Sequence, residues 1–451
     1  MREQGEAEAR RARLRARAAV DAHLLAMHGA PKEAANAGRV RAMTAVPSTV
    51  ERIESAVAAL GSGPLDEERV RRCIAPLFSR VLTAGLGGVY LANHSLGRPL
   101  DAMEDDVREG LAAWYARMGD AWDLWRGEMD AHRARLANLL GAERPDCVVP
   151  KTSAGQGLRA VLNAFDGVPR VVATRGEFDS LDVILREYAR RGRAALTMIE
   201  PRGGGDFAAA DIVAAITREI DLVVVSQVMF QTGQRLTELD AIVARAHAVG
   251  ARVLLDVYHS LGVFPVDITA LGVDFAVGGS YKYLRGGPGA CFVAIAPRLL
   301  DAGFATLDVG WFAKASPFDY ERPDPPRFAA GGDAWLESTP AVLPIYQARA
   351  GQVFMLAMGV ERLRAYSLAL QRRLVALLDE RGIAARGGTE DCGAFVVVRN
   401  ANARAWSAAL EARGIVTDAR GEWLRFCPDM LTTDAELQAA ADALAQVAGG
   451  R

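Results

Sequence analysis

From about residue 145, short apolar and β-branched runs alternate with longer stretches in which apolar residues recur every three or four positions. Such runs are typical of strands buried on both faces of a sheet, and such stretches are typical of helices that cover it. The alternation therefore predicts βαβ units and a mostly parallel α/β sheet. The predicted strands are CVVP (147–150), RVVATR (170–175), LTMIE (196–200), DLVVVSQV (221–228), ARVLLDV (251–257) and VDFAVGGS (273–280).

The pattern differs at the two ends of the chain. The start of the chain consists of polar, helix-like segments, whereas a long helical stretch after Pro344 precedes short strands and further helices. We therefore predict an N-terminal helical segment (1–85), a large α/β domain (86–343) and a small C-terminal α+β domain (344–451). The long helix (346–382) is expected to bridge the last two parts.

Composition restricts the class of protein. Hydrophobic residues make up 51% of the chain, enough for a sizeable core, and the formal net charge is only −2. A charge so close to zero gives no reason to expect a nucleic acid or an anionic membrane as partner. We find no apolar run long enough to span a membrane and no signal-peptide pattern. We therefore expect a cytoplasmic protein.

The five cysteines are an odd number without close spacing, so we expect neither a disulfide framework nor a metal site. This usage fits a reducing compartment. The first 20 residues are rich in arginine but also contain Glu3, Glu6 and Glu8, which favours a solvated helix or arm over a transit peptide.

Lys282, in SYKYLRGGPG (280–289), is one of only four lysines in a chain whose other basic residues are arginines. An arginine would supply the same charge but could not form an imine, whereas a lysine amine can do so once its pKa is lowered. The alternative is an ordinary surface lysine. The residues around it in the predicted sheet decide between the two.

Asp256 ends one predicted strand, and the next strand leads directly to Lys282. Because functional groups gather beyond the carboxyl ends of parallel strands, we expect both side chains at the same edge of the sheet. A buried carboxylate needs a cationic partner, and a protonated pyridine nitrogen supplies one while an aldehyde on the same ring reacts with the lysine. The pair predicts pyridoxal phosphate. The alternative is a capping aspartate and an unrelated lysine.

A phosphate site is predicted where Ser153, Ala154 and Gly155 open a helix after the first strand. Small residues expose the N–H groups of a helix N-terminus, where the dipole favours an anion. The same residues could also serve for capping alone.

The order of TSAG, GEFDS, VSQVMFQTGQ, DVYHSLG and SYKYLRGGPG resembles the class V, fold type I pyridoxal phosphate enzymes, and within them the kynureninases. The resemblance covers about 90–430. It implies a large domain with a mostly parallel, seven-stranded sheet and a small C-terminal domain. It also implies hydrolysis of the Cβ–Cγ bond of L-kynurenine or 3-hydroxykynurenine, a step of tryptophan catabolism, by a homodimer with shared active sites.

Three residues would be catalytic by this resemblance. Lys282 would carry the cofactor as an imine and move protons at Cα, and Asp256 would pair with the ring nitrogen. Tyr281 would bind phosphate and assist proton transfer at the leaving group.

Other residues would line the cofactor. Phe178 would stack on its face with Asp179 beside it, and Ser226 would lie near the ring. His259 would lie near the ring hydroxyl or the phosphate, and Trp311 would reach the phosphate from the partner subunit.

For the substrate, the resemblance implies that Arg425 binds the α-carboxylate, and that His94 and Ser95 of the ANHSLG segment and Thr339 of STP contact the remainder. Three positions depart from the usual pattern: His94 and Thr339 each replace an asparagine, and Lys314 replaces a histidine of some members. These departures affect substrate choice more than cofactor binding.

Two alternatives stay open from the sequence. The chain could be another class V enzyme, such as an aminotransferase, a cysteine desulfurase or lyase, or an epimerase. A desulfurase needs a thiolate on a mobile loop, and neither Cys291 nor Cys427 lies in such a context. The chain could also be a cofactor-free binding protein, which the pairing of Asp256 with Lys282 disfavours.

Overall fold

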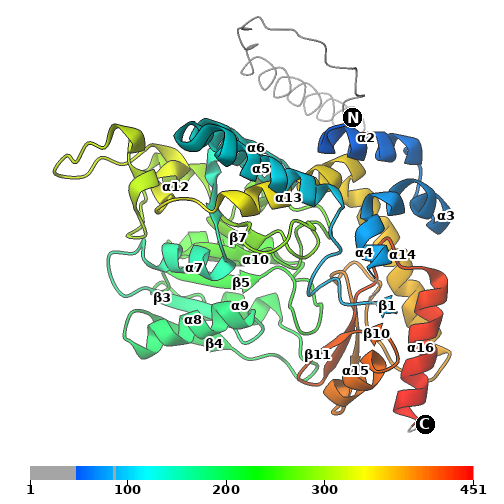
Figure 1. The fold of residues 1–451 in the computed structure, drawn as a ribbon. Coiled ribbons are helices and arrows are strands. Elements are labelled where there is room, and N and C mark those ends of the chain that lie inside the picture. The colour runs from blue at the N-terminus through cyan, green and yellow to red at the C-terminus, as the bar shows by residue number, and fades with distance from the viewer. Residues whose placement is uncertain (1–46, 85–87, 450–451) are drawn as a thin grey trace, which may run out of the picture. The chain divides into compact units, whose positions relative to one another are not determined.

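The computed structural model describes residues 47–84 and 88–449, all of which belong to one compact unit. The Arg-rich start of the chain lies outside the described residues. At the centre of the unit is a seven-stranded sheet in the order β2-β8-β7-β6-β5-β3-β4 (Figure 1). Only β8 runs in the direction opposite to the other strands, so the predicted mostly parallel sheet is confirmed. The strands are β2 (Val148–Lys151), β3 (Arg170–Thr174), β4 (Ala195–Ile199), β5 (Leu222–Ser226), β6 (Arg252–Asp256), β7 (Phe275–Gly279) and β8 (Cys291–Ile295).

Helices cover both faces of this sheet, which explains why its strands are continuously apolar. Along β5, Val223 and Val225 pack in a cluster that includes α10, whereas Leu222 and Val224 pack with α7 and α8 on the other face. Successive strand residues point to opposite faces, so a strand buried on both sides has no polar position. The helices between the strands are α7 (Ala154–Leu162), α8 (Asp179–Arg190), α9 (Ala209–Ala215), α10 (Leu239–Val249) and α11 (Ile268–Leu271).

The part of the chain before β2 is mainly helical. Ser48 caps α2 through a capping box with Glu51, in which each side chain bonds to the other residue's backbone N–H. Among the described residues, no helix combines the length and hydropathy needed to cross a bilayer. The label η marks short turns of π-helix (η1) or 3-10 helix (the others). The helices before β2 are α2 (Thr49–Leu60), α3 (Glu67–Arg69), η1 (Val70–Ile74), η2 (Ala75–Phe78), α4 (Ser79–Thr83), α5 (Ala102–Arg117), η3 (Met118–Asp120), α6 (Ala121–Leu140) and η4 (Pro145–Cys147).

The long helix expected over 346–382 is two helices, α13 (Val342–Met358) and α14 (Val360–Asp379). They are separated by Gly359, whose φ of 79° is a left-handed conformation that glycine adopts without a steric penalty. Pro344 lies in the first turn of α13, where a missing N–H costs no helical hydrogen bond. Between β8 and α13 are only α12 (Pro297–Asp301), η5 (Trp311–Ala313), η6 (Pro317–Asp319) and η7 (Gly331–Trp335).

The smaller C-terminal domain contains an antiparallel sheet in the order β11-β12-β9, whose core includes residues of helices α14, α15 and α16. A short parallel pair, β1 and β10, joins residues near position 90 to this region of the chain. The domain boundaries at 85/86 and 343/344 stay a prediction. The elements are β1 (Val89–Tyr90), β9 (Val396–Arg399), α15 (Ala403–Glu411), β10 (Ile415–Val416), β11 (Asp418–Arg420), β12 (Trp423–Phe426) and α16 (Asp434–Ala448).

Candidate active site

The candidate site lies at the carboxyl edge of the central strands. Strand β5 ends at Ser226 and strand β6 at Asp256, and these two residues are direct partners in the parallel register. Strand β7 ends at Gly279, three residues before Lys282. Parallel pairing thus brings together three of the predicted site residues at one edge of the sheet.

The Lys282 side chain is surrounded by rings and a histidine. Its Nζ lies 2.7 Å from His259 Nε2, 5.1 Å from the centre of the Phe178 ring and 4.8 Å from that of Tyr258. Lys282 is only 4% exposed, and burial lowers the pKa of its amine to about 7 although the carboxylate of Asp256 acts in the opposite direction. Such an amine is nucleophilic near neutral pH.

His259 is neutral, because burial and then the charge of Lys282 hold the pKa of its imidazole well below the usual value. Its Nε2 faces the lysine amine, and its Nδ1 lies 3.2 Å from the hydroxyl of Tyr283. A neutral ring that accepts from the lysine at Nε2 carries its proton on Nδ1. His259 therefore orients the amine without competing for a proton.

Asp256 is buried and accepts the backbone N–H of Tyr258 at 2.7 Å. Burial raises the pKa of its carboxyl, while the Tyr258 hydrogen bond and the charge of Lys282 act in the opposite direction. A carboxyl in this environment is stabilised as an anion by a further cation. The protonated ring nitrogen of pyridoxal phosphate supplies such a charge, so Asp256 fits the cofactor.

Glu177 is a buried carboxyl that the sequence did not single out. Its oxygens accept hydrogen bonds from Thr174 Oγ1 and Ser226 Oγ, each at 2.6 Å. Burial raises the pKa of Glu177 to about 7, and the nearby charge of Asp256 contributes in the same direction. Ser226 therefore contacts Glu177 directly. The sequence did contain a signal for Glu177, because it follows the end of strand β3 just as Ser226 and Asp256 stand at the ends of β5 and β6.

A chain of contacts joins Lys282 to the start of helix α7. The Tyr281 and Tyr258 rings are 5.1 Å apart, and the Tyr258 hydroxyl lies 3.4 Å from the sulfur of Cys291. The backbone N–H of Ala154 is in turn a hydrogen-bond partner of that sulfur. The helix N-terminus predicted to hold phosphate is therefore connected to the lysine by three side chains.

Ser153 is the N-cap of helix α7 and accepts the backbone N–H of Gln156 at 3.1 Å. A Cβ at Gly155 would lie 2.8 Å from Cδ1 of Ile184, the flexible end of a side chain on helix α8. The capping function is therefore present, and the phosphate site at this helix N-terminus stays a prediction.

Arg425 lies on β12 directly opposite Asp418 on β11, as a cross-strand pair. Its Nε is 2.6 Å from Asp418 Oδ1 and its Nη2 is 2.5 Å from Oδ2, and its Nη1 donates to the carbonyl oxygen of Phe230. His94 Nε2 lies 2.8 Å from Asp418, and Ser95 Oγ donates to it at 2.7 Å. His94 and Ser95 thus contact Asp418, a residue that no sequence pattern indicated.

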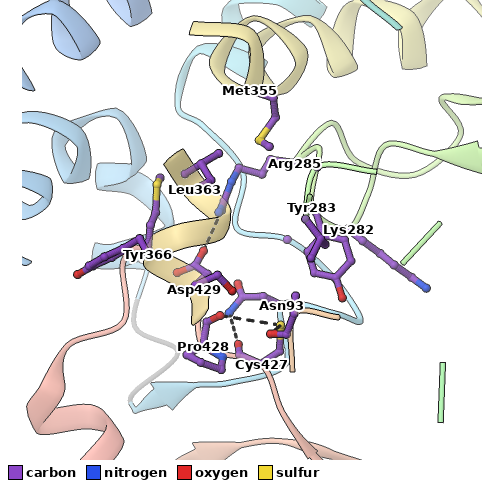
Figure 2. Close-up of a pocket in the computed structure, with 16 residues that line it drawn as sticks. Asn93, Lys282, Tyr283, Arg285, Met355, Leu363, Tyr366, Cys427, Pro428 and Asp429 are labelled. Carbon is purple, nitrogen blue, oxygen red and sulfur yellow. Dashed lines mark hydrogen bonds and ion pairs between the residues drawn. The ribbon is translucent and has the colours of Figure 1, made fainter. Parts of the chain in front are cut away.

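Lys282 also contributes to the lining of a cavity of about 50 Å³, large enough for water molecules (Figure 2). Figure 2 shows the Lys282 side chain extending away from Asp429 and Cys427. Arg285 and Arg98 both pair with Asp429, at 2.9 and 3.0 Å. This buried group connects the turn after Lys282 to the C-terminal domain.

Three further predicted residues, Trp311, Thr339 and Asp179, have surroundings of their own. Trp311 packs against aromatic residues such as Trp122 and Phe318 and donates its indole N–H to a backbone carbonyl. Thr339 is exposed and lines a different cavity, of about 210 Å³, together with Lys151. Asp179 is exposed in the first turn of α8. Asp179 directly follows Phe178, whose ring lies 5.1 Å from Lys282 Nζ, and the cavity at Thr339 is also lined by Cys291. The predicted roles of these three residues stay predictions.

Known proteins resemble the chain in both sequence and fold. Residues 100–423 match the family model "Aminotransferase class-V". The kynureninase of Deinococcus radiodurans is 30% identical over 303 residues, which cover 64% of this chain and 71% of that protein. The kynureninase of Salinispora tropica is 30% identical over 385 residues, which cover 79% and 89%.

Among solved structures, C-DES with glycine covalently linked to its PLP cofactor gives a TM-score of 0.73 at 19% identity, covering 81% of this chain and 98% of that one. This likeness shows the fold. The buried lysine, the carboxylate at the end of β6 and the helix N-terminus after β2 fit the same cofactor in this chain. The chain belongs to the aminotransferase class-V family of fold type I enzymes that use pyridoxal phosphate.

Proposed function

We propose that the protein is a kynureninase-like hydrolase that cleaves the Cβ–Cγ bond of L-kynurenine or 3-hydroxykynurenine, giving L-alanine and the corresponding anthranilate. The supporting observation is the buried Lys282 amine. It lies beside His259, and the charges of Asp256 and Arg425 both influence its pKa. Kynureninases from two bacteria align with most of the chain, which supports this reaction over others of the family.

In this proposal Lys282 has two tasks. Its Nζ holds the cofactor in the absence of substrate and afterwards moves a proton at the substrate Cα. The bound cofactor supplies an electron-withdrawing ring, and the Asp256 carboxylate keeps the ring nitrogen protonated. His259 holds the amine at 2.7 Å. Breaking the Cβ–Cγ bond releases the anthranilate and leaves Cβ to take a proton and become the methyl group of alanine. Tyr281 assists proton transfer at this step, and its ring centre lies 5.7 Å from Lys282 Nζ.

Arg425 binds the α-carboxylate of the amino acid, since a planar guanidinium matches a carboxylate. Trp311 and Thr339 act in the site of a second subunit. A homodimer follows from this assignment. Water enters from solvent and adds to the substrate ketone.

The cysteines of the described chain give no support to a desulfurase. Cys147, Cys291, Cys392 and Cys427 are buried, and Cys73 is half-buried. Burial raises the pKa of both Cys291 and Cys427, which disfavours the thiolate that sulfur transfer requires.

The test is release of anthranilate fluorescence from L-kynurenine by the protein loaded with pyridoxal phosphate. We expect turnover, with Lys282→Arg as the inactive control. A loaded protein that shows the cofactor's absorbance but cleaves neither kynurenine nor 3-hydroxykynurenine would rule the proposal out. Such a result would leave the other class V reactions.

A further inference from the structure

Every nitrogen of the Arg425 guanidinium already has an acceptor. Asp418 faces Nε and Nη2, and the Phe230 carbonyl faces Nη1. Asp418 is therefore placed as a substrate carboxylate would be, with two parallel N–H···O contacts. The arginine that the proposed function assigns to the substrate is occupied by a residue of its own chain.

The side chains around Arg425 differ in how much of their surface is exposed to solvent. The side chain of Arg425 is 3% exposed, that of Asp418 17% and that of Arg420 40%. Arg420 Nη2 lies 3.3 Å from Asp418 Oδ2. Asp418 thus lies between two guanidinium groups, the buried one of Arg425 and the more exposed one of Arg420.

A second carboxylate cannot share Arg425 with Asp418 at low cost. Like charges at hydrogen-bond distance from one guanidinium repel each other, more strongly in a buried site than in water. Asp418 is ionised, because the hydrogen bonds of His94 and Arg425 lower the pKa of its carboxyl despite burial. Binding of an amino acid therefore requires that Asp418 move.

We propose that Asp418 occupies the carboxylate site on Arg425 in the resting protein and exchanges to Arg420 when an amino acid binds. His94 and Ser95 hold Asp418 at 2.8 and 2.7 Å and so set how tightly it competes. Their effect on substrate choice is indirect, through Asp418. The inference rests on the proposed role of Arg425, but it requires only an α-amino acid as ligand, not kynurenine.

The experiment is an absorbance titration of the loaded protein with L-alanine and, separately, with ethylamine, which lacks a carboxylate. Asp418→Asn keeps the shape of the side chain and removes its charge. We expect the apparent Kd for L-alanine to fall about tenfold, the size of one charge-assisted hydrogen bond, with no change for ethylamine. Arg420→Met removes the receiving group and should raise the Kd for L-alanine several-fold.

Glu422→Gln is the matched control, because it removes a carboxylate that pairs with Arg399 in the same sheet, outside this network. Thermal unfolding checks that each variant is folded. A weaker or unchanged affinity for L-alanine in Asp418→Asn overturns the proposal and makes Asp418 a residue that orients Arg425. Equal changes for L-alanine and ethylamine overturn it too. Tighter L-alanine binding without any cleavage of kynurenine keeps this inference and removes only the proposed reaction.

Discussion

The chemistry of the site depends on how burial changes single side chains. Lys282 is buried, so little water is present to stabilise the protonated form of its amine. Burial also keeps the neighbouring His259 neutral. Asp256 and Glu177 are buried carboxyls whose pKa values burial raises. Groups with pKa values displaced toward neutrality are concentrated around one lysine, which is typical of catalytic sites.

Replacing Lys282 by arginine should abolish covalent retention of the cofactor. Arginine keeps the charge but has no amine that forms an imine. The absorbance band of the bound cofactor at about 420 nm should therefore disappear on dialysis. Lys314→Arg is the matched control, because Lys314 instead donates to the carbonyl of Glu321. Borohydride reduction followed by peptide mapping checks the site. Labelling of any lysine other than Lys282 would contradict the assignment.

Capture of the cofactor should depend on pH in the neutral range. Only the unprotonated amine reacts, and the pKa of Lys282 is lowered to about 7, so raising the pH through 7 increases the reactive form. Below that pH we expect the capture rate to rise about tenfold per pH unit, and above it to level off. Stopped-flow absorbance of the apo protein measures this rate.

The same titration with a free lysine derivative controls for protonation of the cofactor itself, because the ordinary lysine pKa is about 10.4. An inflection of the protein's rate at that higher value, instead of near 7, would show that Lys282 is not desolvated before the cofactor arrives.

At the scale of the elements, close backbone contacts hold the turn after β7 that contains Lys282. The backbone N–H of Gly97 donates to the carbonyl of Tyr281 at 2.8 Å, next to Lys282. A Cβ at Gly97 would lie 1.9 Å from the Lys282 carbonyl oxygen, so this position has no space for a side chain. The segment after β1 and the turn after β7 are therefore fitted to each other.

We expect Gly97→Ala to displace this turn. The added methyl should destabilise the protein by about 1–3 kcal/mol and weaken retention of the cofactor. Gly127→Ala is the control, because a Cβ added at this position of helix α6 would have no neighbouring atom within 4 Å outside the helix's own backbone. Urea unfolding of the apo protein and dialysis of the loaded protein measure the two effects. Full retention by Gly97→Ala would mean that the turn does not hold Lys282 in place.

For the complete protein, the central question is whether two subunits share each site. Trp311 and Thr339 are proposed to complete the site of the other subunit, so their roles require a partner subunit. An obligate dimer interface usually buries more than about 2,000 Å². Mass photometry at nanomolar concentration should show a dimer, and a fully active monomer would exclude shared sites.

Mixing two inactive variants provides a sharper check. If Trp311 completes the partner's site, a hybrid of Lys282→Arg and Trp311→Ala subunits contains one intact site and one site with both defects. Random reassociation should then restore about a quarter of wild-type activity. Each variant reassociated with itself is the control. No recovery from a verified hybrid would place Trp311 in the site of its own subunit.

The sequence by itself was sufficient for the cofactor and for six of the seven strands of the central sheet, including the neighbouring strands that carry Asp256 and lead to Lys282, but strand β8 was not predicted. Apolar runs predict strands locally, and parallel strands place their carboxyl ends at one edge whatever the remaining contacts are. The prediction of one long helix over 346–382 was wrong. The helical pattern of apolar residues continues through Gly359, whereas the helical backbone conformation is interrupted there.

Only the tertiary structure showed which groups the site residues contact. Asp418 meets Arg425 through an antiparallel register, and Glu177 meets Ser226 across two neighbouring strands. Such pairs depend on how distant segments are aligned, and a single sequence has no periodic signal for that alignment. The contacts of His94 and Ser95 with Asp418 became visible in the same way, while their predicted role beside the substrate stays a prediction.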